Sequence, residues 1–189
     1  MEITTNQTGK IVIDILNEVA RAEEKHPTWP ADILHASAIV AEEAGELIRA
    51  AVQFEREGGA LIEIRKEAVQ VGATCIRFLL NGRVPISSEK TLINRDELME
   101  SMAPSRVQET AVLFGHIFTG TDFVTKTAHI FSQVADVITA SFINSGYLMR
   151  DRAATLLSMA IILVIQVDDK LYTGEMPKEF PPTTPPNIK

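Results

Sequence analysis

Hydrophobic residues recur every three or four positions along most of this chain, with polar residues between them. Such spacing puts the apolar side chains on one side of an α-helix. Together with capping and breaking residues, the pattern predicts helices over residues 11–25, 32–57, 60–81, 94–103, 105–119, 121–146 and 149–171. We therefore expect an all-α protein, built as one compact helical bundle without a sheet.

The expected helix ends rest on particular residues. Asp32 and Thr121 are placed to act as N-caps, and Asn94 with Glu97 matches a capping box. The polar segment 1–9 suits a frayed terminus or a cap. Four glycines and one proline are expected to end helices: Gly58, Gly59, Gly120, Gly146 and Pro104.

Two breaks divide the chain into parts. Residues 82–91 combine glycine, proline and a serine pair, and are the best candidate for a linker. The segment from residue 174 onward contains five prolines and is expected to be extended. This predicts a helical half over 1–82, a second, structural half over 92–173 and a Pro-rich tail over 174–189.

The two halves show a weak internal repeat. Shifts of 91 and 86 residues lay the second and third predicted helices over helices of the second half and keep the apolar pattern. Glu43 then meets Val134, and Glu67 meets Ala153. Any two amphipathic helices can match in this way, so the pattern indicates either a degenerate duplication or a coincidence.

Two glutamates fall where apolar side chains are expected. At about 100° per residue, Glu43 and Glu67 each lie inside the apolar stripe of their own helix. Glu46 lies at the margin of the first stripe, whereas Glu42 lies outside it on the expected wet side. Two neighbouring helices thus each direct a carboxylate toward a region of apolar packing.

An ionised carboxylate in such a place needs a compensating positive charge, because its desolvation costs several kcal/mol. Oxygen ligands from two facing helices suit a hard cation, Mg²⁺ or Mn²⁺, which keeps waters and takes further ligands from phosphate oxygens. The alternative is a solvated acidic surface, on which Glu46 and Arg49 form an ordinary ion pair.

These acidic residues also carry a family resemblance. The pattern Glu42-Glu43-x-x-Glu46, followed after a spacer by Glu67-x-x-Gln70, resembles the signature of the MazG-like, all-α nucleoside triphosphate pyrophosphohydrolases. The family pattern ends in Asp where this chain has Gln70. The surrounding residues are similar to those of a MazG-like subgroup found in phage and bacterial genomes. The similar segments are His26-Pro27-x-Trp29-Pro30, His35-Ala36, Glu67-Ala68-Val69-Gln70 and Ile76-Arg77-Phe78-Leu79. The resemblance covers residues 11–81.

The resemblance implies a helical bundle that binds Mg²⁺ or Mn²⁺ and hydrolyses a nucleoside triphosphate to the monophosphate and pyrophosphate. Such an enzyme is a hydrolase acting on acid anhydrides, with a nucleotide as its substrate. By position, Glu43, Glu46 and Glu67 would be metal ligands, and Glu42 a ligand or a base that orients water; Glu42 and Glu43 are the catalytic candidates. Gln70 has a carbonyl oxygen for the same metal but brings no charge.

Three further residues are candidates for contact with the substrate. Trp29, the sole tryptophan, suits stacking on a nucleobase, or else packs as a lid over a helix pair. Lys66 and Arg77 suit contact with phosphate, or else lie on a solvated surface. His26 and His35 are expected to be structural hydrogen-bonding residues outside the metal set.

Composition and charge reduce the number of possible classes of function. A net charge of -7 and a pI near 5.1 argue against general nucleic-acid binding. The first ten residues lack the apolar core of a signal peptide, and the most hydrophobic run, 159–167, is too short to span a bilayer. A cytoplasmic protein without membrane contact is expected. The single cysteine, Cys75, excludes an internal disulfide and is expected in the core.

Three classes of function follow from these observations. The preferred hypothesis is a Mg²⁺-dependent nucleotide pyrophosphohydrolase. A MazG-derived protein that binds a nucleotide without turning it over is the alternative that Gln70 favours. A purely structural helical oligomer requires Glu43 and Glu67 to face solvent. A homo-oligomer, a dimer or larger, is the expected assembly.

Overall fold

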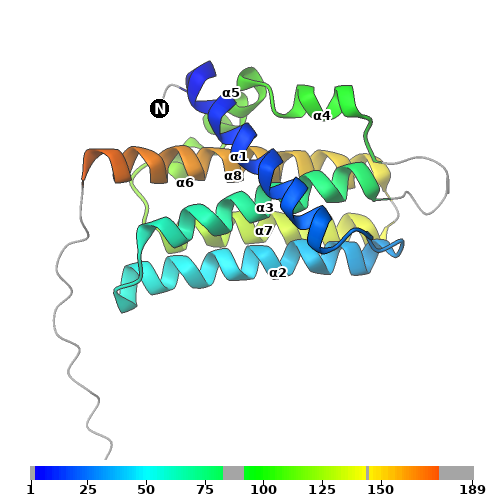
Figure 1. The fold of residues 1–189 in the computed structure, drawn as a ribbon, viewed down its shortest axis with the longest axis horizontal. Helices are drawn as coiled ribbons and strands as arrows, with labels where there is room; N and C mark the ends of the chain where they lie inside the picture. Colours follow the sequence, from blue (N-terminus) through cyan, green and yellow to red (C-terminus); the bar gives the residue numbers. More distant parts are fainter. Residues whose placement is uncertain (1–2, 83–91, 144, 175–189) are drawn as a thin grey trace, which may run out of the picture.

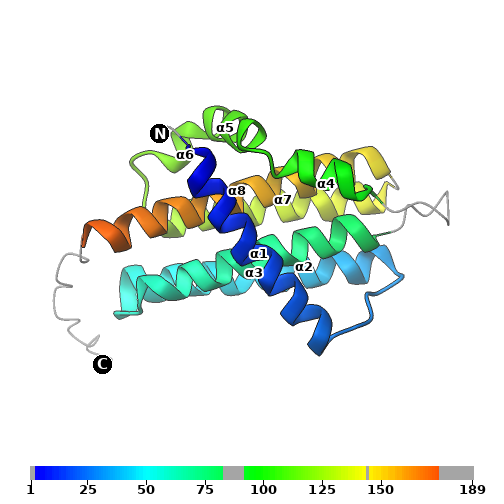
Figure 2. The same ribbon diagram turned by 45° about the horizontal axis from the view of Figure 1, so that its top comes forward.

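The structure, a computed structural model, describes residues 3–82, 92–143 and 145–174 (Figure 1). These residues form helices and connections without a strand, so the predicted all-α class is confirmed for them. The elements are α1 (Thr5–Lys25), α2 (Ile33–Val52), a π-helical turn η1 (Gln53–Glu57), α3 (Leu61–Asn81), α4 (Arg95–Ser101), α5 (Pro104–Leu113), α6 (Gly115–Phe118), α7 (Phe123–Phe142) and α8 (Gly146–Thr173). Helices α2, α3, α7 and α8 form a four-helix bundle, and α1 crosses it on the outside (Figures 1 and 2).

Helix α1 begins six residues earlier than the apolar pattern predicted. Thr4 is its N-cap: the Thr4 hydroxyl accepts from the Gln7 N–H at 3.2 Å, and the Gln7 side chain accepts from the Thr4 N–H at 3.2 Å. The Ile3 N–H also donates to Gln108 Oε1 of α5 at 2.9 Å. The polar lead-in is therefore a capping segment, because side-chain hydrogen bonds satisfy the first N–H groups of a helix without any apolar signal.

In the first helix pair, formed by α2 and α3, α2 begins at its predicted cap and the turn before α3 contains the predicted glycine. Asp32 caps α2, and Gly58, with a φ of 76°, terminates η1 in the left-handed conformation that glycine adopts easily. This turn also touches the second helix pair. Glu55 accepts from the Phe123 N–H at 3.0 Å, and the Phe54 and Phe123 rings meet edge-on with centroids 5.7 Å apart.

The segment between α3 and α7 differs most from the prediction. Asn94 caps α4 as expected, but Pro104 starts α5 instead of closing the preceding helix. Proline fits a first helical turn because the N–H it lacks has no intrahelical acceptor there. The single helix predicted over 105–119 is broken at Phe114 into α5 and α6. The apolar spacing continues through Phe114, so the pattern alone does not reveal this break.

Two cap predictions for α7 and α8 were wrong. Asp122, not Thr121, caps α7, since its carboxylate accepts from a backbone N–H three residues on at 2.7 Å. Gly146 does not end α7, which stops at Phe142; Gly146 is the first residue of α8, after its cap Ser145. The predicted linker and tail fall mainly on residues 83–91 and 175–189, which lie outside the described residues.

One apolar core runs through both helix pairs. The hydrophobic run in α8 lies in it, as does Cys75, whose burial raises the pKa of its thiol; both placements were predicted. At the edge of the core, Arg65 of α3 pairs with Asp14 of α1 at 2.6 Å and with Asp168 of α8 at 2.5 Å. This pairing fixes α1 across the bundle. Within the described residues, every helix is too short or too polar to cross a membrane.

The two helix pairs correspond in a register one residue from the expected one. Helices α2 and α7 both have 20 residues and an aspartate N-cap, which sets Ile33 against Phe123. In this register each of the buried residues of α2 falls on a buried residue of α7. Likewise, when Leu61 is set against Gly146, every buried residue of α3 from Ile64 onward falls on a buried residue of α8. Helix caps define this register more sharply than apolar spacing, which tolerates a shift of one position.

Candidate metal centre

Glu43 and Glu46 of α2 meet Glu67 of α3 on one side of the bundle. One carboxylate oxygen from each residue lies within 4.8 Å of the others. Glu43 and Glu46 are three residues apart, so they project side by side from α2 toward the antiparallel α3. The expected approach of Glu43 to Glu67 across the helix pair is therefore observed.

Among the described residues, no ion pair neutralises the cluster, although the charge of Lys66 offsets part of the rise in the pKa of Glu67 that burial causes. None of the ion pairs formed by the described residues includes Glu43, Glu46 or Glu67. Moreover, the buried Oε2 atoms of Glu43 and Glu67 have no hydrogen-bond partner in the described part of the chain. Buried carboxylate oxygens of this kind are unfavourable unless a proton or a cation satisfies them.

Partial burial raises the pKa of the carboxyl groups of both Glu43 and Glu67. Burial raises the pKa of Glu43 to about 7, and repulsion by Glu46, Glu67, Glu42 and Glu18 contributes to the rise. Burial also raises the pKa of Glu67, with a further contribution from Glu46. A divalent cation between these groups would oppose both shifts, because a nearby positive charge favours the ionised form.

The donor set fits a hard divalent cation. Three carboxylates from two helices, two of them with unsatisfied oxygens, supply the oxygen ligands that Mg²⁺ and Mn²⁺ prefer. Gln70 lines the same cleft as Glu43 and Glu46, which adds a neutral amide to the surroundings of the cluster. Glu42 is exposed and also lines that cleft, which places its carboxylate on the water side of the cluster.

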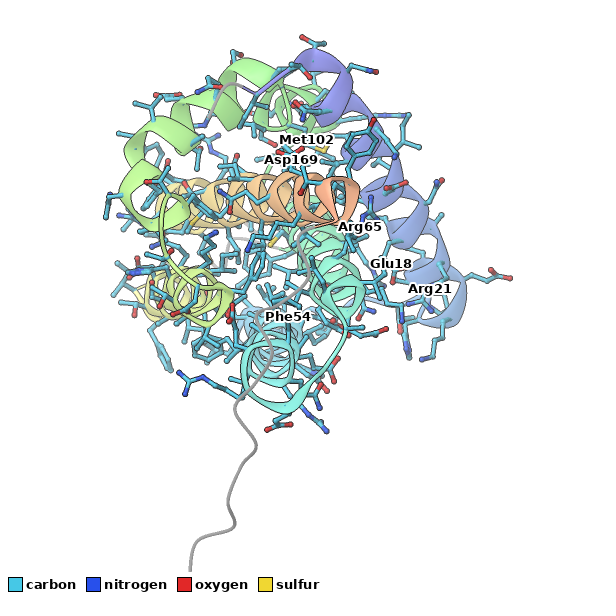
Figure 3. The ribbon with its side chains drawn as sticks, turned by 90° about the vertical axis from the view of Figure 1, so that its left-hand side faces the viewer. Glu18, Arg21, Phe54, Arg65, Met102 and Asp169 are labelled. Atoms are coloured by element: carbon cyan, nitrogen blue, oxygen red, sulfur yellow. The ribbon has the colours of Figure 1, made fainter. Side chains whose placement is uncertain are left out.

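A cleft of about 840 Å³ opens beside these carboxylates. The end of α1, the connection 26–32, α2 and α3 contribute to it, and its lining includes the basic or imidazole side chains Arg21, Lys25, His26, His35 and Arg77. Glu18 and Arg21 of α1 lie on the α3 side of the bundle (Figure 3). A polar cleft with both carboxylates and cationic groups suits a ligand whose phosphates are complexed with a metal.

Trp29 and Arg77 lie together in this cleft. The Arg77 guanidinium carbon is 4.9 Å from the Trp29 ring centroid, and Nη2 donates to the His26 carbonyl at 2.6 Å. Arg77 is only 7% exposed, so the expectation of a solvated surface was wrong for it. Trp29 packs against the core, as its lid alternative expects. The buried Trp29 Nε1 and Arg77 Nε have no acceptor among the described residues, which leaves two donors unused.

Lys66 lies outside the cleft lining. Its side chain is exposed, and Nζ lies 2.8 Å from Glu63 Oε2, three residues earlier on α3. An exposed pair of this spacing forms readily on any helix surface. Lys66 nevertheless lies close enough to Glu67 to offset part of the rise in its pKa that burial causes, and it lines a neighbouring cavity together with Gln70.

Sequence reasoning missed Glu18. Its side chain is only 17% exposed, lines the cleft and raises the pKa of both Glu43 and Glu67 by repulsion. Glu18 sits between the buried residues Ile15 and Val19 of α1. An acidic residue inside a buried stripe was the same signal that singled out Glu43.

The second helix pair lacks an equivalent acidic cluster among the described residues. In the register set by the helix caps, Gln133, Asp136, Arg152 and Thr155 occupy the positions of Glu43, Glu46, Glu67 and Gln70. The apolar replacements expected from the shifted alignment were therefore wrong. An arginine in the place of one carboxylate supplies a fixed positive charge, which removes the need for a metal there.

A second cleft, of about 520 Å³, lies between α4, α5 and α8. Most of its charged groups pair with one another: Arg150 with Glu97 at 3.4 Å, and Arg106 with Glu109 at 2.9 Å and with Asp151 at 3.8 Å. Among the described residues, the buried carboxylate oxygens without a hydrogen-bond partner belong to Glu43 and Glu67, on α2 and α3. Comparison of the chain with family models, curated proteins and solved structures returns no match, so the assignment rests on this geometry.

Proposed function

We propose that the chain is a Mg²⁺-dependent nucleotide pyrophosphohydrolase that converts a nucleoside triphosphate to the monophosphate and pyrophosphate. The observation that carries the proposal is the group of Glu43, Glu46 and Glu67 beside a polar cleft, with buried oxygens of Glu43 and Glu67 that have no hydrogen-bond partner among the described residues. The MazG-like pattern of acidic residues supports the same activity.

In this proposal the carboxylates of Glu43, Glu46 and Glu67 hold the cation, and Gln70 adds a neutral oxygen. When bound, Mg²⁺ would neutralise phosphate charge and make water more acidic. Glu42, exposed at the cleft, orients the attacking water and accepts its proton. Attack of that water on the α-phosphorus forms a phosphorus–oxygen bond, and the α–β anhydride bond breaks with pyrophosphate as the leaving group.

The cleft supplies groups for the rest of the nucleotide. Lys25 at the end of α1 brings positive charge for the phosphates, and Arg21, which pairs with Glu18 at 2.5 Å, lines the same cleft. Trp29 and Arg77 line the cleft, and a base can stack on exposed parts of the Trp29 ring.

A panel of nucleoside triphosphates with Mg²⁺, scored for pyrophosphate release, tests the proposal. Glu67→Gln should lose turnover, because it removes one ligand charge while keeping the side-chain shape. Glu63→Gln, on the same helix but with a side chain that is 45% exposed and paired with Lys66, should retain it. Equal activity of the two variants would contradict the assigned site.

The second candidate is a protein that binds the nucleotide without hydrolysing it. Gln70 favours this function, because a neutral ligand leaves the site with one negative charge fewer than the family pattern has. Mg²⁺-dependent binding by the wild type, without any product across the panel, would support it over the enzyme.

A further inference from the structure

The outer side of the α2–α7 layer carries two apolar stripes. On α2 the stripe consists of Leu34, Ala38, Ala41, Gly45, Ile48 and Val52. On α7 it consists of Val124, Ala128, Phe131, Ala135, Ile138 and Phe142. Both follow the alternating spacing of four and three residues with which helices pack side by side, and neither contains a charged residue. We call the two stripes together the α2–α7 face.

Both stripes lie on the same side of the bundle. On α2, Ser37 meets α7, because its Oγ is 3.0 Å from Ser141 Oγ, whereas Glu43 meets α3. At about 100° per residue, the α2 stripe follows Ser37 around the helix and lies on the side away from Glu43. The α7 stripe occupies the same positions in the register that matches Ile33 with Phe123.

Among the described residues, other helices cover different sides of the bundle. Helix α1 packs against α3 and α8, and α5 packs against α8 (Figures 2 and 3). The α2–α7 face therefore stays open, with Phe142 68% and Phe131 39% exposed. Aromatic side chains on an uncharged, helix-sized surface are typical of a protein interface.

We propose that this face joins two copies of the chain. Its two stripes differ in size: the centre of the α2 stripe, formed by Ala38, Ala41 and Gly45, is small, whereas Phe131 and Phe142 project from α7. A Cβ added at Gly45 would meet no atom within 4 Å, so this part of the α2 surface is open. A groove and a ridge on one face fit each other when a second copy is turned by 180° about an axis parallel to the helices. Each α7 then packs on α2 of the other copy.

The available area suits a modest dimer. Two 20-residue helices present a surface of roughly 30 Å by 20 Å, or about 600 Å² per copy, which is at the lower end for a specific interface. The partner is another copy because the ridge and the groove occur together on the same face. This inference is independent of the proposed activity.

Light scattering with size-exclusion chromatography of the full chain tests the dimer. At about 100 μM, a concentration that populates a micromolar complex, wild type should show twice the 20.8 kDa chain mass. Phe142→Glu and Ala135→Glu should show the monomer mass, because each places a charge in the apolar contact. Val112→Glu is the matched control: Val112 is 72% exposed on α5, away from the face, and the variant should remain dimeric. A monomeric wild type, or dimeric Phe142→Glu and Ala135→Glu variants with unchanged circular dichroism, would overturn the proposal.

Disulfide crosslinking tests the pairing of α7 with α2 of the other copy. Cys75 is fully buried and does not compete. The antiparallel pairing of Ser37 with Ser141 puts Ala135 level with the stretch between Ala41 and Gly45. A mixture of Ala41→Cys and Ala135→Cys chains should therefore form a covalent heterodimer on mild oxidation. Crosslinking of Ala41→Cys with itself, in preference to the mixture, would overturn this pairing.

Discussion

Replacement of Glu43 by glutamine should make the metal-free protein more stable at pH 8. Burial, with repulsion from Glu46, Glu67, Glu42 and Glu18, raises the pKa of Glu43 from 4.5 to about 7. The folded state therefore binds more protons than the unfolded state between these two values, and the free energy of unfolding falls as pH rises through this window. At pH 8 the loss has reached its full size.

The size of the effect follows from the shift. At 1.36 kcal/mol per pKa unit, the rise to about 7 corresponds to about 3 kcal/mol, and water at this half-buried side chain reduces it to about 1–3 kcal/mol. Glutamine keeps the shape of glutamate without its charge. Metal-free Glu43→Gln should thus exceed wild type in stability by that amount at pH 8 and by little at pH 5.

Urea unfolding followed by circular dichroism, in chelator at both pH values, measures this difference. Glu109→Gln is the control, since the exposed Glu109 pairs with Arg106 on α5, away from the cluster, and its replacement should not create the same pH dependence. Addition of Mg²⁺ at 100 times its dissociation constant should stabilise wild type by about 2.7 kcal/mol and the Glu43→Gln variant by less. Equal stability of wild type and Glu43→Gln at pH 8 in chelator, or an equal gain from Mg²⁺, would refute this account of the cluster.

Four further substitutions have defined expected outcomes. Gln70→Asp should tighten Mg²⁺ binding in a calorimetric titration, because it adds a negative charge at the cleft; weaker binding would place Gln70 away from the metal. Arg65→Met should lower the free energy of unfolding by about 1–3 kcal/mol in urea titrations, since it leaves two partly buried aspartates unpaired; an unchanged midpoint would show that the pairs contribute nothing. Gly58→Ala, at a φ of 76°, should cost about 1 kcal/mol, whereas Gly9→Ala in the exposed part of α1 should stabilise by up to about 1 kcal/mol; thermal melts compare the two.

The amino-acid sequence by itself determined the helices and the main acidic residues. Apolar spacing indicated the bundle helices, because burial of one side of a helix repeats every 3.6 residues. The same periodicity singled out Glu43 and Glu67, since a carboxylate inside an apolar stripe contradicts the pattern around it. Caps with a strong side-chain acceptor, such as Asp32 and Asn94, were also readable from the sequence.

Only the tertiary structure decided which of these residues meet. The cleft depends on how α1 crosses α2 and α3, so the position of Glu18 beside the cluster and the burial of Arg77 emerged only with that packing, and Lys66 fell outside the cleft lining. The break at Phe114 and the start of α8 at Gly146 were hidden, because apolar spacing continues across a kink and does not say which side of a glycine is helical. The register between the two helix pairs also needed the structure. Periodicity describes one helix at a time, whereas contacts between helices depend on their relative rotation and shift.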